Sequence, residues 1–201
     1  MSDFQTFMQL GVRHIVDIGA MDHILFLLAL ATIYRVSDWR EVVRVVTAFT
    51  IGHSITLAAA VFGFLPLSAR VVEFLIPLTI VATCIENILV KNRSAALWHG
   101  HYRPVFATVF GLVHGAGFGG YLKSLFLDRI VVPLFGFNVG IEIGQLGVLA
   151  LTFAAIAVLD LAIRQSRIAQ PRIAPLRLRV LAVSTAVMIV AARWAVERSP
   201  W

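Results

Sequence analysis

Four ionisable residues stand at the head of the first strongly apolar stretch of this chain. His14 and Asp17 are one helical turn apart, and Asp22 and His23 directly precede the run ILFLLALATI. A charged group at the centre of a membrane-spanning helix costs about 2.5–3.5 kcal/mol, so such groups need a partner, water or a bound cation. Imidazole and carboxylate together suit divalent ions such as Ni²⁺, Co²⁺, Zn²⁺ and Cu²⁺. The segment therefore favours metal chemistry.

Further histidines, carboxyl groups and amides recur inside the later apolar stretches. Asn138, Glu142 and Gln145 are spaced i, i+4 and i+7, which predicts one polar stripe along a helix. The candidate metal ligands are His14, Asp17, Asp22, His23, His53, His114 and Glu142, and the residues expected to line the rest of a path are Glu73, Glu86, Asn87, Asn138 and Gln145. Two other interpretations stay open, a path for protons or another solute and a purely structural polar network.

The spacing of the first two histidines raises a geometric question. On a regular helix His14 and His23 would lie on opposite faces and about 13 Å apart, so one ion would not reach both. Either the segment around Gly19 is unwound, as in broken helices that line a cavity, or there are two sites in series. In the second case His14 and Asp17 form an outer pair, and Asp22 and His23 form an inner one.

Composition decides the class of protein that must position these residues. The chain has 201 residues, of which 59% are hydrophobic and 14% charged, as in polytopic membrane proteins. Each span needs about 20 predominantly apolar residues. We predict an all-α membrane protein, a single domain over residues 1–201, with six transmembrane helices at approximately 10–34, 42–64, 71–90, 104–125, 131–163 and 178–196. The N-terminus lacks the features of a cleaved signal peptide, so the first span is expected to be retained.

Basic residues predict the orientation. The first, third and fifth connections hold eleven lysines and arginines, whereas the second and fourth hold three. The positive-inside bias then places the odd connections in the cytoplasm and both termini on the non-cytoplasmic side. Because the net charge of +6 is spread between spans, nucleic acid is not an expected partner. The third connection also carries His99 and His101, a weak candidate for cytoplasmic metal capture.

Two glycine series predict close helix packing. Gly111, Gly115 and Gly119 recur every four residues, and so do the three glycines of the next span, Gly136, Gly140 and Gly144. Small residues at this spacing let backbones approach closely in lipid, so these two helices should pack on each other or on close neighbours. In the fifth span the glycines lie roughly opposite the polar stripe.

Five blocks in order carry a resemblance to a known family. They are GVRHIVDIGAMDHILFLLAL, TAFTIGHSITLA, VVEFLIPLTIVATCIEN, FGLVHGAGFGGYL and FGFNVGIEIGQL. Together they resemble the HupE/UreJ family of bacterial membrane proteins, and its second branch most closely. The resemblance implies a small permease of the bacterial inner membrane that passes nickel or cobalt and is associated with maturation of hydrogenase or urease. It maps the family's Asp-His pair to Asp22 and His23, and the leading histidine to His14.

The favoured function is a permease for a divalent transition metal ion, nickel or cobalt first, with copper and zinc as further candidates. The metal is substrate, no residue is assigned a catalytic role, and no nucleotide motif is visible. The partners expected are the lipid bilayer, the ion and metalloenzyme maturation proteins, and oligomerisation is left open. An intramembrane metal-dependent hydrolase is the main rival, although HExxH and GxSxG motifs are absent from the sequence. An accessory subunit of a larger membrane complex is the third alternative.

Overall fold

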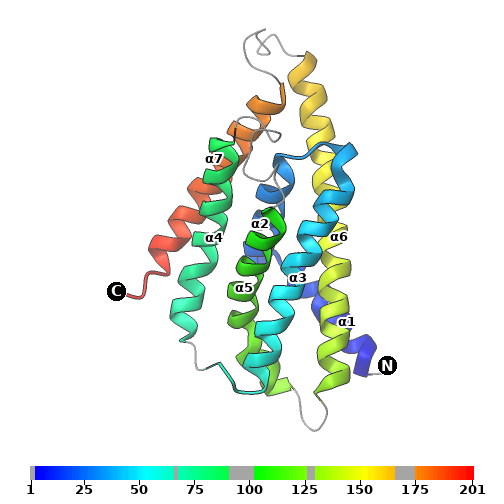
Figure 1. Ribbon diagram of the computed structural model, residues 1–201, viewed down its shortest axis with the longest axis vertical. Helices are drawn as coiled ribbons and strands as arrows, with labels where there is room; N and C mark the ends of the chain where they lie inside the picture. The colour runs from blue at the N-terminus through cyan, green and yellow to red at the C-terminus, as the bar shows by residue number, and fades with distance from the viewer. Residues whose placement is uncertain (1–2, 66–67, 91–101, 126–129, 166–174) are drawn as a thin grey trace.

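The computed structural model describes residues 3–65, 68–90, 102–125, 130–165 and 175–201, and all regular structure within them is helical (Figure 1). Within these ranges, seven α-helices and two short 3-10 helices follow one another. They are α1 Asp3–Val16, η1 Ile18–Ala20, α2 Asp22–Thr32, η2 Val36–Asp38, α3 Trp39–Val61, α4 Ala69–Leu89, α5 Arg103–Leu125, α6 Val131–Gln165 and α7 Pro175–Glu197. The predicted pair His99 and His101 lies outside the described residues.

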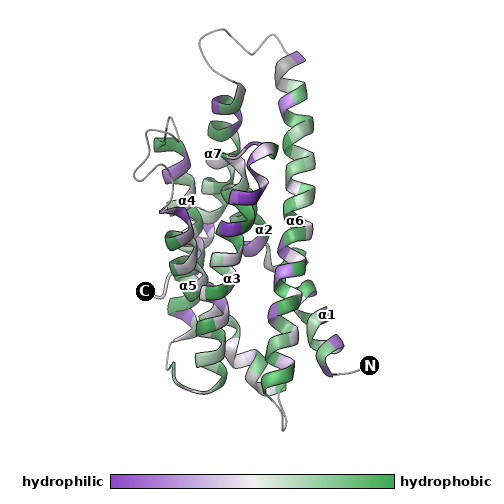
Figure 2. Cartoon of the chain, turned by 45° about the vertical axis from the view of Figure 1, so that its right-hand side comes forward, coloured by the Kyte–Doolittle hydropathy of each residue, from purple (hydrophilic) through white to green (hydrophobic). Residues whose placement is uncertain are grey.

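In the described part of the chain, five helical segments are long and apolar enough to cross a membrane. They are Val36–Val61, Ala69–Leu89, Arg103–Leu122, Val131–Ala162 and Leu176–Glu197. Figure 2 shows apolar residues along nearly the whole length of α6, as expected for a helix whose outer surface meets lipid. The chain is therefore an all-helical, multi-pass membrane protein, and these five segments correspond closely to the last five predicted spans.

The first predicted span, 10–34, is not one continuous helix. The backbone at Asp17 is extended, with φ −66° and ψ 115°, and its carboxylate accepts a hydrogen bond of 2.8 Å from the Gly19 amide. This side-chain cap satisfies a backbone donor at the start of η1, so the chain leaves α1 and restarts as α2. α2 has 11 residues and is about 16 Å long, well short of the about 30 Å of a bilayer core. Of the two alternatives that the sequence left open, the structure shows the break near Gly19.

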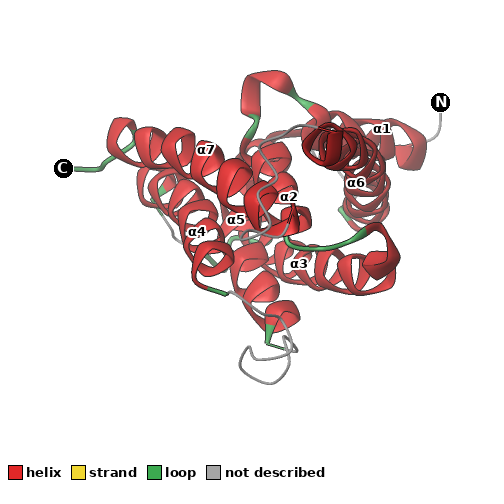
Figure 3. Ribbon diagram, turned by 90° about the horizontal axis from the view of Figure 1, so that it is seen from above, coloured by secondary structure: helices red, strands yellow, loops and turns green. Residues whose placement is uncertain are grey.

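The two glycine series pack against neighbours rather than against each other. α5 lies along α3, and α6 lies along α1, with α4 beside α7 as the third close pair (Figure 3). A Cβ added at Gly111 would lie 2.1 Å from the Phe49 carbonyl oxygen, and one at Gly140 would lie 2.0 Å from that of Met8. Only glycine permits backbones to approach so closely.

From α3 to α7, successive helices run in alternate directions. α3, α5 and α7 begin at the upper end of Figure 1, and α4 and α6 end there, while both termini lie lower in the bundle. This upper end holds two arginines that bind the carbonyl groups left open where helices stop. Arg177 donates to the Ile88 carbonyl at 2.6 Å, and Arg179 donates to the Tyr34 carbonyl at 2.7 Å. Arg179 is only 1% exposed and also pairs with Asp160.

Candidate metal centre

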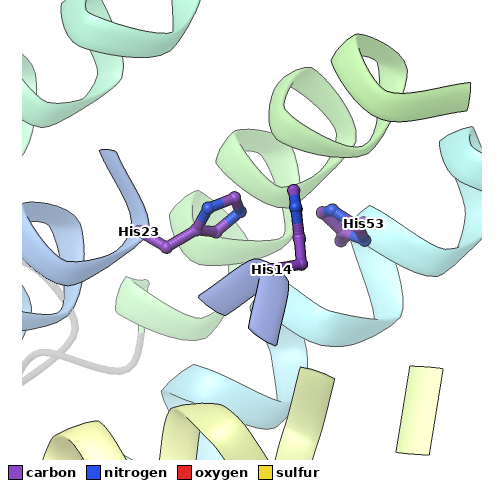
Figure 4. Close-up of side chains that lie close together, drawn as sticks. All are labelled: His14, His23 and His53. Atoms are coloured by element: carbon purple, nitrogen blue, oxygen red, sulfur yellow. The ribbon is translucent and has the colours of Figure 1, made fainter. Parts of the chain in front are cut away.

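Four histidines from four helices meet inside the bundle. His14 lies near the end of α1, His23 is the second residue of α2, and the other two come from the middle of α3 and α5. The ring centroids of His14 and His53 are 6.2 Å apart, those of His23 and His53 are 6.0 Å apart, and those of His23 and His114 are 5.3 Å apart. In Figure 4 the rings of His14, His23 and His53 point toward a common centre. We call these four residues the histidine cluster.

The break in the first span is what brings the first two histidines together. The rings of His14 and His23 are 4.7 Å apart, against the about 13 Å that a regular helix would impose. Their meeting is the outcome predicted for an unwound segment around Gly19. The other interpretation, with His14 and Asp17 as a separate outer site, does not describe this arrangement because His14 lies with His23.

The spacing of the ligand atoms is close to that of a metal site. His14, His23 and His53 each offer a nitrogen, and these three nitrogens lie within 4.8 Å of one another. Ligands about 2.0–2.1 Å from a tetrahedral ion would be about 3.3 Å apart, so closing the site requires a movement of roughly 1 Å per ring.

The histidine cluster contains several polar atoms that no described protein group satisfies. His53 is 0% exposed, and neither of its ring nitrogens has a hydrogen-bond partner in the described part of the chain. The same holds for Nε2 of His14, Nε2 of His23 and Nδ1 of His114. An unsatisfied buried polar group costs about 1–3 kcal/mol, so several at one point call for an explanation. Imidazole lone pairs that face one another in a buried centre are the ligand set of a transition metal ion.

The predicted carboxylate ligands lie elsewhere. Asp22 accepts from Arg198 at 3.1 Å and 3.2 Å, so its charge is paired with a residue just beyond α7. Asp17 caps η1. Glu142 accepts a 2.7 Å bond from Thr47, and it is not among the described groups that could hold one ion together. The arrangement expected from the sequence, with Asp22 and Glu142 beside the histidines, is replaced by a centre of imidazoles.

The predicted polar stripe of α6 faces α3 and forms a ladder of three cross-helix hydrogen bonds. Thr47 donates to Glu142, Thr50 donates to Gln145 at 2.7 Å, and Ser54 donates to Asn138 at 2.6 Å. The α6 glycines face α1, so the prediction of a packing face opposite a polar face is confirmed. Within the described chain, Oε2 of Glu142 and Nε2 of Gln145 are buried without a partner.

The remaining predicted path residues do not reach the histidine cluster. Glu73 is exposed near the beginning of α4. Glu86 accepts from Tyr102 and Arg103, and Asn87 donates to the Ala29 carbonyl at 2.7 Å. Because their oxygen and nitrogen atoms are already engaged, Glu86 and Asn87 join α4 to its neighbours instead of offering free ligands.

Two cavities lie on opposite sides of the histidine cluster. The lower cavity, about 660 Å³, is lined by Arg13, His14, Asp17, Ile18, Phe118 and Tyr121, and it reaches the surface at the exposed Ile18. The upper cavity, about 80 Å³, includes Phe26, Thr83, Glu86, Arg103, Ala107 and Phe110 in its lining. Along one face of α5, Phe110 borders the upper cavity, His114 belongs to the cluster and Phe118 borders the lower cavity.

Aromatic rings separate the cluster from the upper cavity. Phe26 stacks on Phe49 with centroids 4.8 Å apart, and these two rings lie 5.6 Å and 5.1 Å from that of His114. Both phenylalanines are 1% exposed. Neither phenylalanine was predicted as a site residue, because a single apolar residue in an apolar helix cannot be told from its neighbours by type or spacing. We call Phe26, Phe49 and Phe110 the aromatic barrier.

The helices and the histidine cluster together define a multi-pass membrane protein with a buried centre of histidine side chains. The family model described as HupE / UreJ protein matches residues 1–198. The chain therefore belongs to the HupE/UreJ family, as its five sequence blocks predicted. Neither the comparison with curated proteins nor the comparison with solved structures found a match.

Proposed function

We propose that this protein is a permease for a divalent transition metal ion, with nickel or cobalt as the preferred substrate and copper or zinc as further candidates. The observation that carries the proposal is the histidine cluster, which holds five buried ring nitrogens without partners in the described chain and brings one nitrogen each from His14, His23 and His53 within 4.8 Å of one another. Neutral imidazoles bind ions of this group in preference to Mg²⁺ or Ca²⁺, which favour oxygen ligands.

The ligand set also suits an ion that must be released. A metal site with enough carboxylates to balance the charge of the ion would hold that ion tightly. Here Asp22 is paired with Arg198, and Glu142 bonds to α3, so the ion in the cluster would keep most of its charge. Such a charge in a low-dielectric surrounding is bound less tightly, as a transport site requires.

The cavities on either side support passage rather than storage. An ion would enter by the lower cavity, where Asp17 offers an exposed carboxylate and His14 already faces the cluster. It would leave by the upper cavity once Phe26 and Phe49 move aside. This is alternating access, in which one side of a central site is open while the other is closed.

We place the protein in the bacterial inner membrane, with both termini on the non-cytoplasmic side. The support is the predicted clustering of basic residues, of which Arg103, Arg177 and Arg179 belong to the first two turns of α5 and α7, the helices that begin at the upper end of the bundle. The upper cavity would then open toward the cytoplasm, where metalloenzyme maturation proteins could receive the ion.

An intramembrane metal-dependent hydrolase is the alternative. The open lower cavity beside His14 is the observation in its favour, because a hydrolase needs a one-sided route for water and substrate. Against it, the hydroxyl of Ser54 is engaged with the Thr50 carbonyl and Asn138, and so is turned toward α6.

The test is ion flux into liposomes that contain the purified protein. Ni²⁺, Co²⁺, Zn²⁺ and Cu²⁺ are added outside, and an entrapped chelating dye reports their entry. We expect flux for at least one ion, and its loss in His23→Ala and His114→Ala. If the folded protein passes none of the four ions, the permease proposal is wrong. Release of a peptide or ester product by the metal-loaded protein would instead support the hydrolase.

A further inference from the structure

Thr79 of α4 is the side chain that contacts a ring nitrogen of His114. Its Oγ1 lies 3.0 Å from Nε2 of His114, and both residues are buried. Thr79 is not among the site residues predicted from the sequence, and a threonine inside an apolar helix often bonds to its own backbone.

The protons of this contact can be assigned by counting donors. A hydroxyl group has one proton and two lone pairs. Oγ1 of Thr79 donates its proton to the Ile76 carbonyl at 2.7 Å, one turn earlier in α4. The oxygen therefore presents a lone pair to His114, and the ring must donate from Nε2.

The assignment of one nitrogen decides the state of the other. In a neutral imidazole that carries its proton on Nε2, Nδ1 holds the free lone pair. Nδ1 of His114 is buried and has no hydrogen-bond partner among the described groups. Its ring lies 5.3 Å from that of His23, one of the three histidines whose nitrogens lie within 4.8 Å of one another.

We propose that Thr79 is a positioning residue that holds His114 as the Nε2–H tautomer, so that Nδ1 becomes the fourth nitrogen ligand beside His14, His23 and His53. The metal-binding part rests on the proposed function, whereas the tautomer does not. Thr79 takes the place of the carboxylate or carbonyl that usually orients a metal-binding histidine. Because a hydroxyl oxygen is a weaker acceptor than a carboxylate, it fixes the ring without strengthening the ligand, which favours release of the ion.

The tautomer is tested directly by nuclear magnetic resonance of ¹⁵N-histidine-labelled protein without metal, at a mildly alkaline pH at which imidazole is neutral. His114→Ala identifies the resonances of His114. We expect Nε2–H in the wild type and in Thr79→Ser, which keeps the hydroxyl, and a loss of this preference in Thr79→Val. An Nδ1–H tautomer in the wild type, or an unchanged tautomer in Thr79→Val, would overturn the proposal.

A Co²⁺ titration, followed by visible absorption, tests the consequence for binding. Outer-shell partners of histidine ligands are worth about 10–100-fold in affinity, and we expect a loss of that size in Thr79→Val and rescue in Thr79→Ser. Equal affinity in the wild type and Thr79→Val would refute the positioning role, with the proposed function left standing. The Nε2–H tautomer in a wild-type protein that binds no Co²⁺, Ni²⁺, Zn²⁺ or Cu²⁺ would uphold the orientation by Thr79 and refute the proposed function.

Discussion

Two groups of polar residues inside this bundle differ in one decisive respect. At the upper end, Arg177 and Arg179 donate to the open carbonyl groups of α4 and α2, and Arg103 pairs with Glu86. In the histidine cluster, by contrast, His53 has no partner for either nitrogen in the described chain. At the upper end, one oxygen of Asp160, the partner of Arg179, is the only buried side-chain nitrogen or oxygen atom in the described chain that lacks a hydrogen bond. The imidazoles of the histidine cluster are instead left with free lone pairs.

The difference separates residues that build the fold from residues that await a ligand. A bonded arginine at a helix end stabilises the structure and has no capacity left for an ion. A set of unsatisfied imidazoles destabilises the ligand-free protein, and a bound cation removes that cost. Glu86 and Asn87, which the sequence analysis placed on the path, belong to the first class.

Replacing Arg179 is expected to have the largest effect and would test the structural class. Arg179→Met leaves Asp160 and two carbonyl groups of the α2 end without their partner, which should lower the free energy of unfolding by about 3–5 kcal/mol. The measurement is thermal or dodecyl sulfate unfolding of the purified protein. Arg193→Met is the matched control, since its pair with Glu197 is exposed and such surface ion pairs contribute little to stability. If both substitutions lower the free energy of unfolding equally, the buried arginine at the upper end is not a special structural residue.

Replacing His53 should reverse this pattern. His53→Leu removes two unsatisfied nitrogens at similar volume, so the stability of the metal-free protein should stay unchanged or rise. Metal affinity should fall by about 100-fold or more. Losing an outer-shell partner alone lowers the affinity by up to about 100-fold, and a direct ligand contributes at least as much. Isothermal titration with Ni²⁺ and Co²⁺ checks the affinity, and Thr108→Val, which removes a hydroxyl bonded only to its own helix at Pro104, serves as control. Lower stability with unchanged affinity would class His53 as a structural residue.

Thinning the aromatic barrier should change flux without changing affinity. Phe26→Leu keeps an apolar core residue but shortens the ring that stacks on Phe49 next to His114. We expect a severalfold faster downhill flux into liposomes with the same binding constant, because the closed side opens more readily. Slower flux, or flux unchanged within error, would mean that the route does not pass Phe26. Phe62→Leu is the control, as that ring is exposed at the end of α3.

The smallest effect is expected in the ladder between α3 and α6. Ser54→Ala removes one bond to Asn138, and such bonds between membrane helices average about 0.6 kcal/mol. Unfolding should shift by about that amount, with metal affinity and flux unchanged. A full loss of function would instead indicate that Ser54 takes part in chemistry, as the hydrolase alternative requires.

Much of the fold could be predicted from the sequence because the signals are local. Apolar runs predicted five of the spans, since each helix satisfies its own backbone and needs only lipid around it. The spacing of Asn138, Glu142 and Gln145 predicted a shared face, and the α6 glycines predicted a packing face opposite to it. The spacing of the glycines, however, did not show which helix each series packs against, and the α5 glycines pack on α3.

The candidate site was predicted in part. His14, His23, His53 and His114 were all predicted as site residues because an ionisable side chain inside a membrane span is costly. The structure brings the four together. The carboxylates were selected by the same reasoning but lie elsewhere. A buried charge is costly without a partner, but the sequence does not show which group that partner is. For Asp22 the partner is Arg198, 176 residues away.

The sequence by itself determined the class of the protein, the helices and the residue types that could bind an ion, because composition and periodicity act over a few turns. Only the tertiary structure decided which of those residues share a centre. Residues 11–26, GVRHIVDIGAMDHILF, show why, since one extended residue at Asp17 turns two histidines from opposite faces toward each other. A change of backbone direction at a single residue moves every side chain after it, and its outcome depends on the helices that receive them.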